Sequence, residues 1–446
     1  MSHFDPGSFR DPASRVVLRN GAVERLLTTQ GRDDWEALAA SGLLEAWKGR
    51  LVATELGEDL TLVHERMPFW TYPYEWSFGM LKRAALFHLE LNQAALASGL
   101  DLKDATPYNI QFRGREPIFV DLGSFRAYRP GEPWIGYGQF CRLFLYPLLI
   151  QAYSGIAFQP LLRGDLEGID PETANAMLKG QKLRPGVALD VTMQARAQRR
   201  VDAERDVRHE LSSAGFKPEM IAANQKRLHG VISRLEWKPE TSAWSGYAQC
   251  DHVASQRQAK TEFVESVLRD RPRSLVWDLG ANDGHFSRLA ASHADLVLAA
   301  DADQLVIDRL YRDLVENGPD NILPLVFDLS NPSPGLGWRG RERQRLEDRG
   351  KPDLILLLAV IHHLVVAGNL PLSEVMDWLA SLRSEIIFEW VPPNDPLAKR
   401  LAINKRANEI HGDYNEASLR ALLASNFAVQ TEKAWEGRIL FHVLPR

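Results

Sequence analysis

A turn with two glycines, placed between a strand and a helix, constrains this chain more than any other feature. The segment VWDLGANDG, residues 276–284, follows an apolar run at 274–278 and opens a helical pattern at 284–292. Gly280 permits a tight turn beneath a ligand, and Gly284 permits a close approach of the helix to the strand. Because such a turn also suits NAD, FAD or no ligand at all, other residues must decide its purpose.

Strands and helices alternate in the part of the chain that contains this turn. Apolar runs separated by helical patterns indicate a parallel sheet covered on both faces. Two last strands joined by a short turn predict a closing antiparallel hairpin. We therefore expect an α/β domain with a Rossmann-like sheet over residues 236–446. Its expected elements are strands at 274–278, 296–301, 323–328, 354–360, 385–390, 428–434 and 438–444, with helices at 284–292 and 304–317.

Acidic residues at the ends of three strands narrow the choice of ligand. Asp278 stands two residues before Gly280, where a carboxylate repels a diphosphate but suits the ammonium group of a methionine moiety. Asp301 ends the next strand and can accept both hydroxyls of a ribose, a role that NAD enzymes share. Asp328 and Leu329 follow the third strand, where a side chain can accept a hydrogen bond from an adenine amino group.

These residues resemble the D-x-G-x-N-x-G variant of the fingerprint of class I S-adenosylmethionine-dependent methyltransferases. Asn282 departs from the many members that have a second glycine at that position. The resemblance implies S-adenosylmethionine as the cofactor, and a seven-stranded sheet of order 3-2-1-4-5-7-6 with strand 7 antiparallel. It also implies cofactor contacts from Asp278, Gly280, Asn282, Gly284, Asp301, Asp328, Leu329 and Ala359.

Candidates for the reaction site follow the fourth and fifth strands. His362 and His363 stand where the family places its substrate, and a histidine can take a proton from an acceptor near neutral pH. One of them can instead bond the backbone at a helix start. Glu389 lies at the carboxyl edge of the sheet, where it can orient a hydroxyl or amine acceptor or pair with an arginine such as Arg400.

A second polar constellation lies in the N-terminal half. Asp104, Asn109 and Asp121 have a spacing similar to that of protein-kinase-like and aminoglycoside-phosphotransferase-like enzymes. That resemblance implies Asp104 as the acceptor base and Asn109 and Asp121 as Mg²⁺ ligands. Residues 1–60 contain no glycine-rich phosphate loop, and only Arg25 or Lys48 can replace the phosphate-binding lysine. We therefore expect residues 1–235 to form an α+β, mostly helical, kinase-like domain without kinase activity.

The whole chain is also similar to bacterial two-domain methyltransferases that include nodulation-protein-like members. The leading hypothesis is methyl transfer to a small-molecule or carrier-bound acceptor. The alternatives are a bifunctional protein with an ATP-dependent phosphotransferase half, a catalytically silent cofactor-binding scaffold and, last, an NAD oxidoreductase.

Composition limits the partners and the compartment. The net charge of −5 over 446 residues gives no reason to expect nucleic acid or a membrane surface as a partner. Cys141 and Cys250, the two cysteines, share no metal-ligand spacing, and no apolar signal region begins the chain, so we expect a cytoplasmic protein without a disulfide framework.

The arginine-rich insert at 331–351 is expected to be a solvated helix or, less favoured, a basic lid. The sequence leaves the oligomeric state open.

Overall fold

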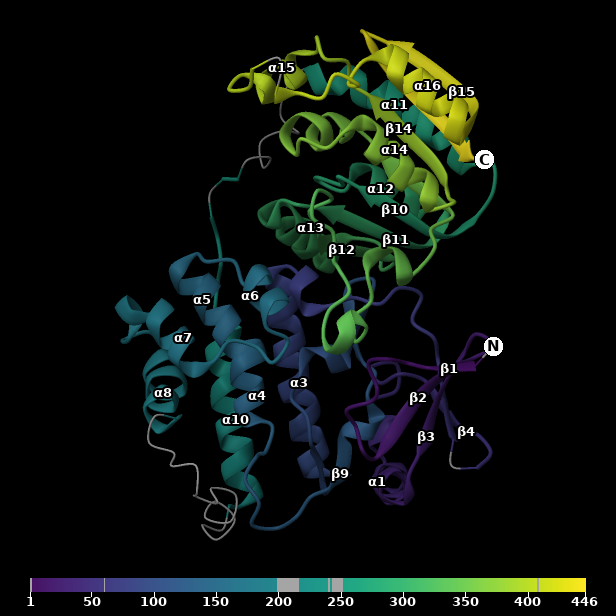
Figure 1. Cartoon of the computed structure of the whole chain (residues 1–446). Helices are drawn as coiled ribbons and strands as arrows, with labels where there is room; N and C mark the ends of the chain where they lie inside the picture. The colour runs from purple at the N-terminus through teal and green to yellow at the C-terminus, as the bar shows by residue number, and fades with distance from the viewer. Residues whose placement is uncertain (1, 60, 199–215, 240, 243–251, 407–408) are drawn as a thin grey trace. The chain divides into compact units, whose positions relative to one another are not determined.

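The computed structural model divides the chain into two compact units (Figure 1). The N-terminal unit comprises Met1–Lys238 and Leu336–Arg343, and the C-terminal unit comprises Pro239–Gly335 and Gln344–Arg446. The structure describes residues 2–59, 61–198, 216–239, 241–242, 252–406 and 409–446.

The C-terminal unit is built on a seven-stranded sheet. The first five strands in chain order run parallel to one another. The next two form the antiparallel end of the sheet, where β16 runs antiparallel to both β14 and β15. Numbered along the chain, the order is the predicted 3-2-1-4-5-7-6, so the expected sheet is confirmed. From one edge to the other the strands are β12 (Ile322–Val326), β11 (Ala294–Asp301), β10 (Arg273–Leu279), β13 (Leu354–Leu357), β14 (Glu385–Trp390), β16 (Arg438–Pro445) and β15 (Phe427–Trp435).

Helices pack against this sheet because its central strands are apolar on both faces. Every residue of β13 and β14 is buried, and Val276 of β10 shares a hydrophobic cluster with Phe263 and Ile307 from two different helices. The second of these helices begins where the Asp303 carboxylate accepts the backbone N–H groups of Leu305 and Val306. The helices are α11 (His252–Leu268), α12 (His285–Ala291), α13 (Gln304–Asn317), α14 (Leu372–Ser381), α15 (Pro396–Ala402) and α16 (Glu416–Asn426).

The N-terminal unit combines a five-stranded antiparallel sheet with a helical part. The dipeptide Asn20-Gly21 is typical of a tight hairpin turn; that hairpin is present, and both residues have the positive φ angles that the turn requires. The sheet order is β1 (Ser2–Phe4), β2 (Ser14–Arg19), β3 (Ala22–Leu27), β5 (Thr61–His64) and β4 (Thr54–Leu56), and two further pairs are β6 (Leu100–Leu102) with β9 (Phe125–Ala127) and β7 (Ile110–Arg113) with β8 (Glu116–Phe119). The helices are α1 (Thr29–Ala40), α2 (Leu43–Ala46), α3 (Phe78–Ala97), α4 (Tyr137–Phe140), α5 (Tyr146–Ser154), α6 (Gln159–Gly164), α7 (Pro171–Met177), α8 (Met193–Gln198) and α10 (Pro218–Ser233).

The arginine-rich insert differs from its prediction. Instead of a solvated helix, it forms irregular chain with two short 3-10 turns, η8 (Trp338–Gly340) and η9 (Leu346–Asp348). Gly337 and Gly340, both at positive φ, prevent a continuous helix. Within the N-terminal unit, Glu342 of this segment accepts two hydrogen bonds from Arg10, at 2.8 and 3.1 Å.

Two other expectations meet limits of the description. Trp244 and Tyr247 stand just before the Rossmann-like pattern, where we expect packing between the domains, with a cover for the cofactor as the alternative; both lie outside the described residues. The units separate after Lys238, close to the expected boundary at residues 235–236, but the kinase-like character of the first domain stays a prediction. In the described parts of the chain, no helix combines the length and the apolar character needed to cross a membrane.

A buried ion cluster fixes the amino-terminal end of β14. The Glu385 carboxylate accepts hydrogen bonds from Arg271 and Arg273, both at 3.0 Å, and lies 2.7 Å from His442 Nε2. Burial opposes ionisation of Glu385, but the bonds from His442 and the two arginines outweigh burial and lower its pKa to about 2. Because the pKa is lower in the folded chain, the cluster stabilises it above the unfolded pKa near 4.5.

We predict that Glu385→Gln removes about 3 kcal/mol of stability from the C-terminal unit at neutral pH. In the unmodified chain this contribution falls as the pH drops from about 4.5 towards 2, and the variant should lack that part of the acid dependence. Urea unfolding followed at several pH values measures both effects. The control is Glu432→Gln, whose half-exposed pair with Arg420 should contribute less than about 1 kcal/mol. Equal losses for the two variants would contradict the assignment.

Candidate functional site

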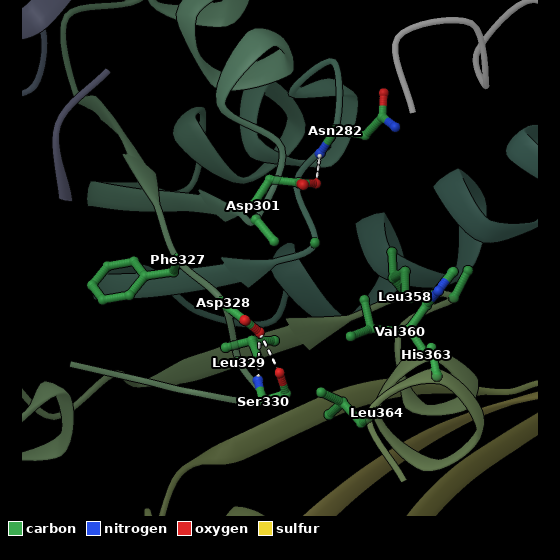
Figure 2. Close-up of a pocket in the computed structure, with 15 residues that line it drawn as sticks. Asn282, Asp301, Phe327, Asp328, Leu329, Ser330, Leu358, Val360, His363 and Leu364 are labelled. Atoms are coloured by element: carbon green, nitrogen blue, oxygen red, sulfur yellow. Dashed lines mark hydrogen bonds between the residues drawn. The ribbon is translucent and has the colours of Figure 1, made fainter. Parts of the chain in front are cut away.

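A cavity of about 400 Å³ lies at the carboxyl ends of the parallel strands (Figure 2). It opens where the chain order of the sheet reverses, between β10 and β13, which is where open α/β sheets bind ligands. Its walls come from the segments that follow β10, β11, β12 and β13. The lining residues are Gly280, Asn282, Asp301, Ala302, Phe327, Asp328, Leu329, Ser330, Leu358, Ala359, Val360, His363, Leu364, Ala367 and Gly368.

The turn after β10 forms one wall because two of its residues adopt left-handed backbone angles. Gly280 has φ +91°, and a Cβ there would lie 2.3 Å from Val360 Cγ2 across the cavity. Asn282 has φ +47°, and asparagine is among the residues that tolerate this conformation best. Asparagine can therefore replace the second glycine of the fingerprint without disturbing the turn.

Asp301 at the end of β11 joins two segments of the cavity wall. Its Oδ2 accepts the backbone N–H of Asn282 at 3.0 Å, and its Oδ1 accepts that of Asp303 at 2.9 Å. Burial raises the pKa of Asp301, and these backbone hydrogen bonds offset part of the rise. Each oxygen keeps a second lone pair, so the carboxylate can also accept hydroxyl groups of a ligand in the cavity.

Asp278 and Gly284 do not line the cavity. Asp278 is buried below the turn, where it accepts a hydrogen bond of 2.5 Å from the Ser287 hydroxyl of α12. Burial raises its pKa to about 7. Gly284 begins α12 at φ +77°, and a Cβ there would lie 2.6 Å from Leu310 of α13, so this glycine serves helix packing. A direct contact of either residue with a cofactor stays a prediction.

The segment after β12 brings Asp328 and Leu329 to the cavity, together with Ser330. The Asp328 Oδ1 atom accepts both the backbone N–H of Ser330 at 2.9 Å and its hydroxyl at 2.6 Å. This bend is a local aspartate turn. Ser330 was missed in the sequence, although an aspartate two residues before a serine is the pattern from which such a turn can be predicted.

The segment after β13 supplies the opposite wall. Ala359 lines the cavity at φ +55°, a strained conformation for a residue with a Cβ, and such strain is concentrated at functional sites. The chain then forms a π-helical turn, η10 (His363–Ala367), whose residues His363, Leu364 and Ala367 face the cavity. The π-helical turn could not be predicted, because its side-chain spacing does not differ clearly from that of an α-helix.

The two neighbouring histidines take different positions. His363 lines the cavity, and burial lowers its pKa, so its ring is neutral at neutral pH. His362 is completely buried, and neither ring nitrogen has a hydrogen-bond partner among the described residues. Burial, with a smaller effect of His363, lowers the pKa of His362 to about 3. Of the two candidates, only His363 faces the space that a ligand can enter.

Glu389 is held inside a network of charges away from the cavity lining. Its side chain has no exposed surface, with Oε2 at 2.7 Å from Lys260 Nζ and Oε1 at 3.0 Å from Arg438 Nη1. Arg438 also forms two hydrogen bonds with Asp395, at 2.8 and 3.1 Å. The partners of Glu389 are thus Lys260 and Arg438, not the suggested Arg400.

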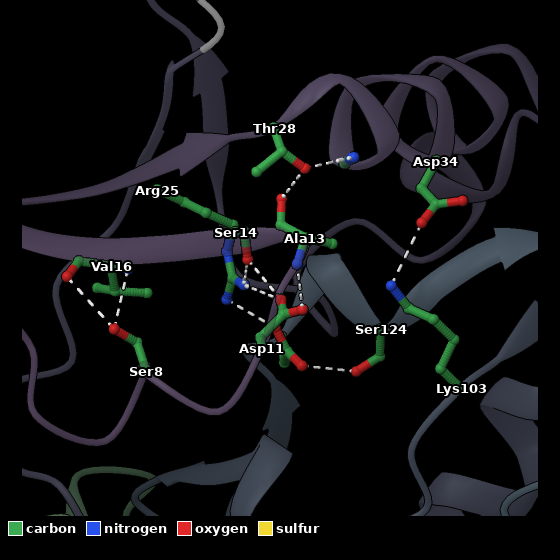
Figure 3. A network of polar contacts seen from close by, with 12 residues as sticks. Ser8, Asp11, Ala13, Ser14, Val16, Arg25, Thr28, Asp34, Lys103 and Ser124 are labelled. Carbon is green, nitrogen blue, oxygen red and sulfur yellow. Dashed lines mark hydrogen bonds and ion pairs between the residues drawn. The ribbon is translucent and has the colours of Figure 1, made fainter.

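Of the N-terminal constellation, Asp121 contacts Arg25, whose guanidinium also lies beside Ser14 and Asp11 (Figure 3), whereas Asp104 is exposed. Asp121 precedes η3 (Leu122–Ser124) and pairs with Arg25 at 2.6 Å, whereas the exposed Lys48 pairs with Glu45 at 3.7 Å. Asn109 ends η2 (Pro107–Asn109) and donates a hydrogen bond of 3.0 Å to the Ser124 hydroxyl. No group of three or more His, Cys, Asp or Glu side chains suited to a metal occurs among the described residues.

Comparison with known proteins gives one relative that spans almost the whole chain. No protein-family model matches the sequence. The nodulation protein NoeA of Rhizobium meliloti (strain 1021) is 35% identical over 452 residues, which cover 95% of this chain and 92% of the relative.

Solved structures match a smaller part of the chain. Magnesium protoporphyrin IX methyltransferase (ChlM) from Synechocystis PCC 6803 with bound SAH is 19% identical, with a TM-score of 0.30, and the match covers 43% of this chain and 85% of that one. The N-methyltransferase NodS from Bradyrhizobium japonicum WM9 is 14% identical, with a TM-score of 0.30, and covers 44% of this chain and 98% of that one.

We predict that Gly280→Ala destabilises the C-terminal unit by about 2–4 kcal/mol, since the new methyl group adds a collision with Val360 to the cost of a left-handed alanine. The matched control is Gly437→Ala. Gly437 also has a positive φ, but a Cβ there would meet nothing within 4 Å, so only the backbone cost of about 1–2 kcal/mol applies. Chemical denaturation of the two variants measures the difference. If both lose the same stability, the turn does not pack against Val360 as described.

Proposed function

The chain belongs to the family of the nodulation protein NoeA, and from the chemistry of its cavity we propose that it binds S-adenosylmethionine and transfers the methyl group to a small-molecule or carrier-bound acceptor. The observation that carries this proposal is the charge of the lining. Two carboxylates, Asp301 and Asp328, face the cavity, and no lysine or arginine occurs among the described residues that line it.

This charge pattern favours a cationic ligand over a dinucleotide. S-adenosylmethionine carries a positive sulfonium and a positive ammonium group against one carboxylate. NAD and FAD carry a diphosphate, which two carboxylates without a neighbouring cation repel. The cavity lies in an α/β sheet at the usual place for a nucleoside, so the lining charge decides between these ligands.

The polar and apolar walls fit the two ends of an adenosine. Asp301 keeps acceptor capacity beyond its backbone bonds, and we assign it to the ribose hydroxyls. We assign Leu329 and Leu358 to apolar contact with the adenine. We assign Asp328 to accept a hydrogen bond from the adenine amino group. The methionine end then lies along the turn at Gly280. Asp278, held by Ser287 below that turn, positions α12, and its direct contact with the ammonium group of the ligand stays a prediction.

His363 is the residue that we assign to the acceptor. Methyl transfer from a sulfonium is an in-line displacement, and most of its acceleration comes from alignment of donor and acceptor. When the acceptor atom carries a proton, a neutral histidine at the cavity wall can take it. His362 and Glu389 do not line the cavity, so in this proposal they support the wall and do not touch the acceptor.

We predict that S-adenosylhomocysteine binds the full chain with micromolar affinity in titration calorimetry, and that NAD does not bind. Asp301→Asn keeps the shape of the side chain but removes one acceptor oxygen and the charge. This change should weaken the binding of S-adenosylhomocysteine by about 100-fold, because hydrogen bonds to a charged group are lost. Asp320→Ala, an exposed change outside the cavity lining, should leave the affinity unchanged.

Two results would refute the proposal. One is binding of NAD without binding of S-adenosylhomocysteine. The other is an affinity for S-adenosylhomocysteine that Asp301→Asn and Asp320→Ala leave equally intact, because a ligand held elsewhere would not depend on Asp301.

A further inference from the structure

Three polar side chains are completely enclosed in the helical part of the N-terminal unit. They belong to His88 and Asn92 of α3 and to Gln225 of α10, and each residue is 0% exposed. None of their six side-chain nitrogen and oxygen atoms has a hydrogen-bond partner among the described residues. Buried polar atoms in folded proteins almost always have such partners, because the hydration lost on folding must be replaced. These three side chains therefore require a partner.

The two helices that carry these side chains pack against each other and run in opposite directions (Figure 1). Near the start of α3, Lys82 Nζ donates to two backbone carbonyl groups at the end of α10 and just beyond it, at 2.8 and 2.7 Å. Further along α3, Glu90 Oε1 lies 3.7 Å from His229 Nε2 of α10. Each step forward along α3 thus corresponds to a step backward along α10. This register places Gln225 level with Asn92.

Both amide side chains belong to the buried stripe of their helix. In α10 the buried residues Ile221, Gln225 and Leu228 follow one another at intervals of four and three, and Lys226, next to Gln225, is exposed. In α3 the buried residues include Asn92 and Ala95, one turn apart on the same face. The two amides are therefore level with each other and are withdrawn from bulk water.

His88 extends the polar stripe of α3 by one turn. It stands four residues before Asn92 on the same face of the helix, and its ring packs on Phe140 and Phe144, with centroid distances of 5.9 and 5.7 Å. Burial lowers the pKa of His88 to about 3, so the ring is neutral, with one N–H donor and one acceptor nitrogen. All three side chains are thus uncharged and can both donate and accept hydrogen bonds. Such a set suits a small neutral molecule rather than an ion.

From this arrangement we propose that the interface of α3 and α10 is a binding site for internal water, in which ordered water bridges the amides of Asn92 and Gln225 and bonds the ring of His88. Water donates and accepts in equal measure, and buried water usually makes about three hydrogen bonds to polar groups that have no other partner. Water held in this way joins α10 to α3 and favours one register of the two helices over its neighbours.

Apolar substitutions distinguish bridged amides from amides that have no partner. Asn92→Leu and Gln225→Met each replace an amide by an apolar group of similar size. If water bridges the amides, either change leaves the other amide unsatisfied, so the interface becomes less stable. We expect backbone amides of α3 and α10 to exchange hydrogen at least about tenfold faster in each variant, as measured by mass spectrometry on the full chain. Lys226→Met, an exposed change beside Gln225, should leave the exchange unchanged.

The opposite sign would overturn the proposal. Amides that lack a partner destabilise the fold, so their replacement by apolar groups would slow hydrogen exchange in α3 and α10. Unchanged exchange in both variants would overturn the proposal as well.

A crystal structure of the unsubstituted full chain separates bridging water from a direct bond and decides the matter even if the variants do not fold. We expect ordered water within about 3.2 Å of both the Asn92 and the Gln225 amide. A direct hydrogen bond between the two amides, with no water bound to either, would contradict the proposal.

Discussion

The Asp301 carboxylate is the contact on which the cofactor cavity depends. It holds the backbone N–H of Asn282 in the turn after β10 and that of Asp303 at the start of α13. Partial burial of this carboxylate is costly, as its raised pKa shows, and the two backbone donors offset only part of that cost. A ligand that adds hydroxyl donors at the same oxygens would complete the hydrogen bonding. The Asp301 carboxylate would then hold both the turn and the ligand.

The acids of the cavity differ from other acidic clusters among the described residues in having no lysine or arginine as a partner. Two acids elsewhere in the chain face arginine or lysine: Glu389 contacts Lys260 and Arg438, and Asp121 contacts Arg25. Within the described residues, Asp301 and Asp328 take part in no ion pair. Acids that have no cation of their own are placed to receive one from a ligand. This contrast supports a cationic nucleoside as the ligand of the C-terminal unit.

The order of the sheet could be predicted from the sequence, because each parallel strand is an apolar run and the chain closes with a hairpin. Seven of the fifteen lining residues were also predicted, among them Gly280, Asn282 and Asp301, which follow their strands at the expected spacing. The choice of ion-pair partners could not be read in this way. Glu389 is bound by one residue from α11 and one from β16, and only the tertiary fold brings these together.

Other features could not be predicted because they depend on local backbone and side-chain geometry. Asp278 has the expected spacing from Gly280, but its hydrogen bond with Ser287 of α12 could not be predicted from that spacing. The insert at 331–351 has a composition typical of a helix, yet its glycines at positive φ keep it irregular. His362 and His363 are adjacent in the sequence, and the π-helical turn places one in the cavity wall and the other in the core.

A crystal structure of the full chain grown with S-adenosylhomocysteine would test the cofactor assignment most directly. The nucleoside should lie at the carboxyl ends of β10–β13, with its ribose hydroxyls on Asp301 and its thioether directed towards His363. A cavity that stays empty in such crystals, or that holds the ligand with its ribose away from Asp301, would contradict the assignment.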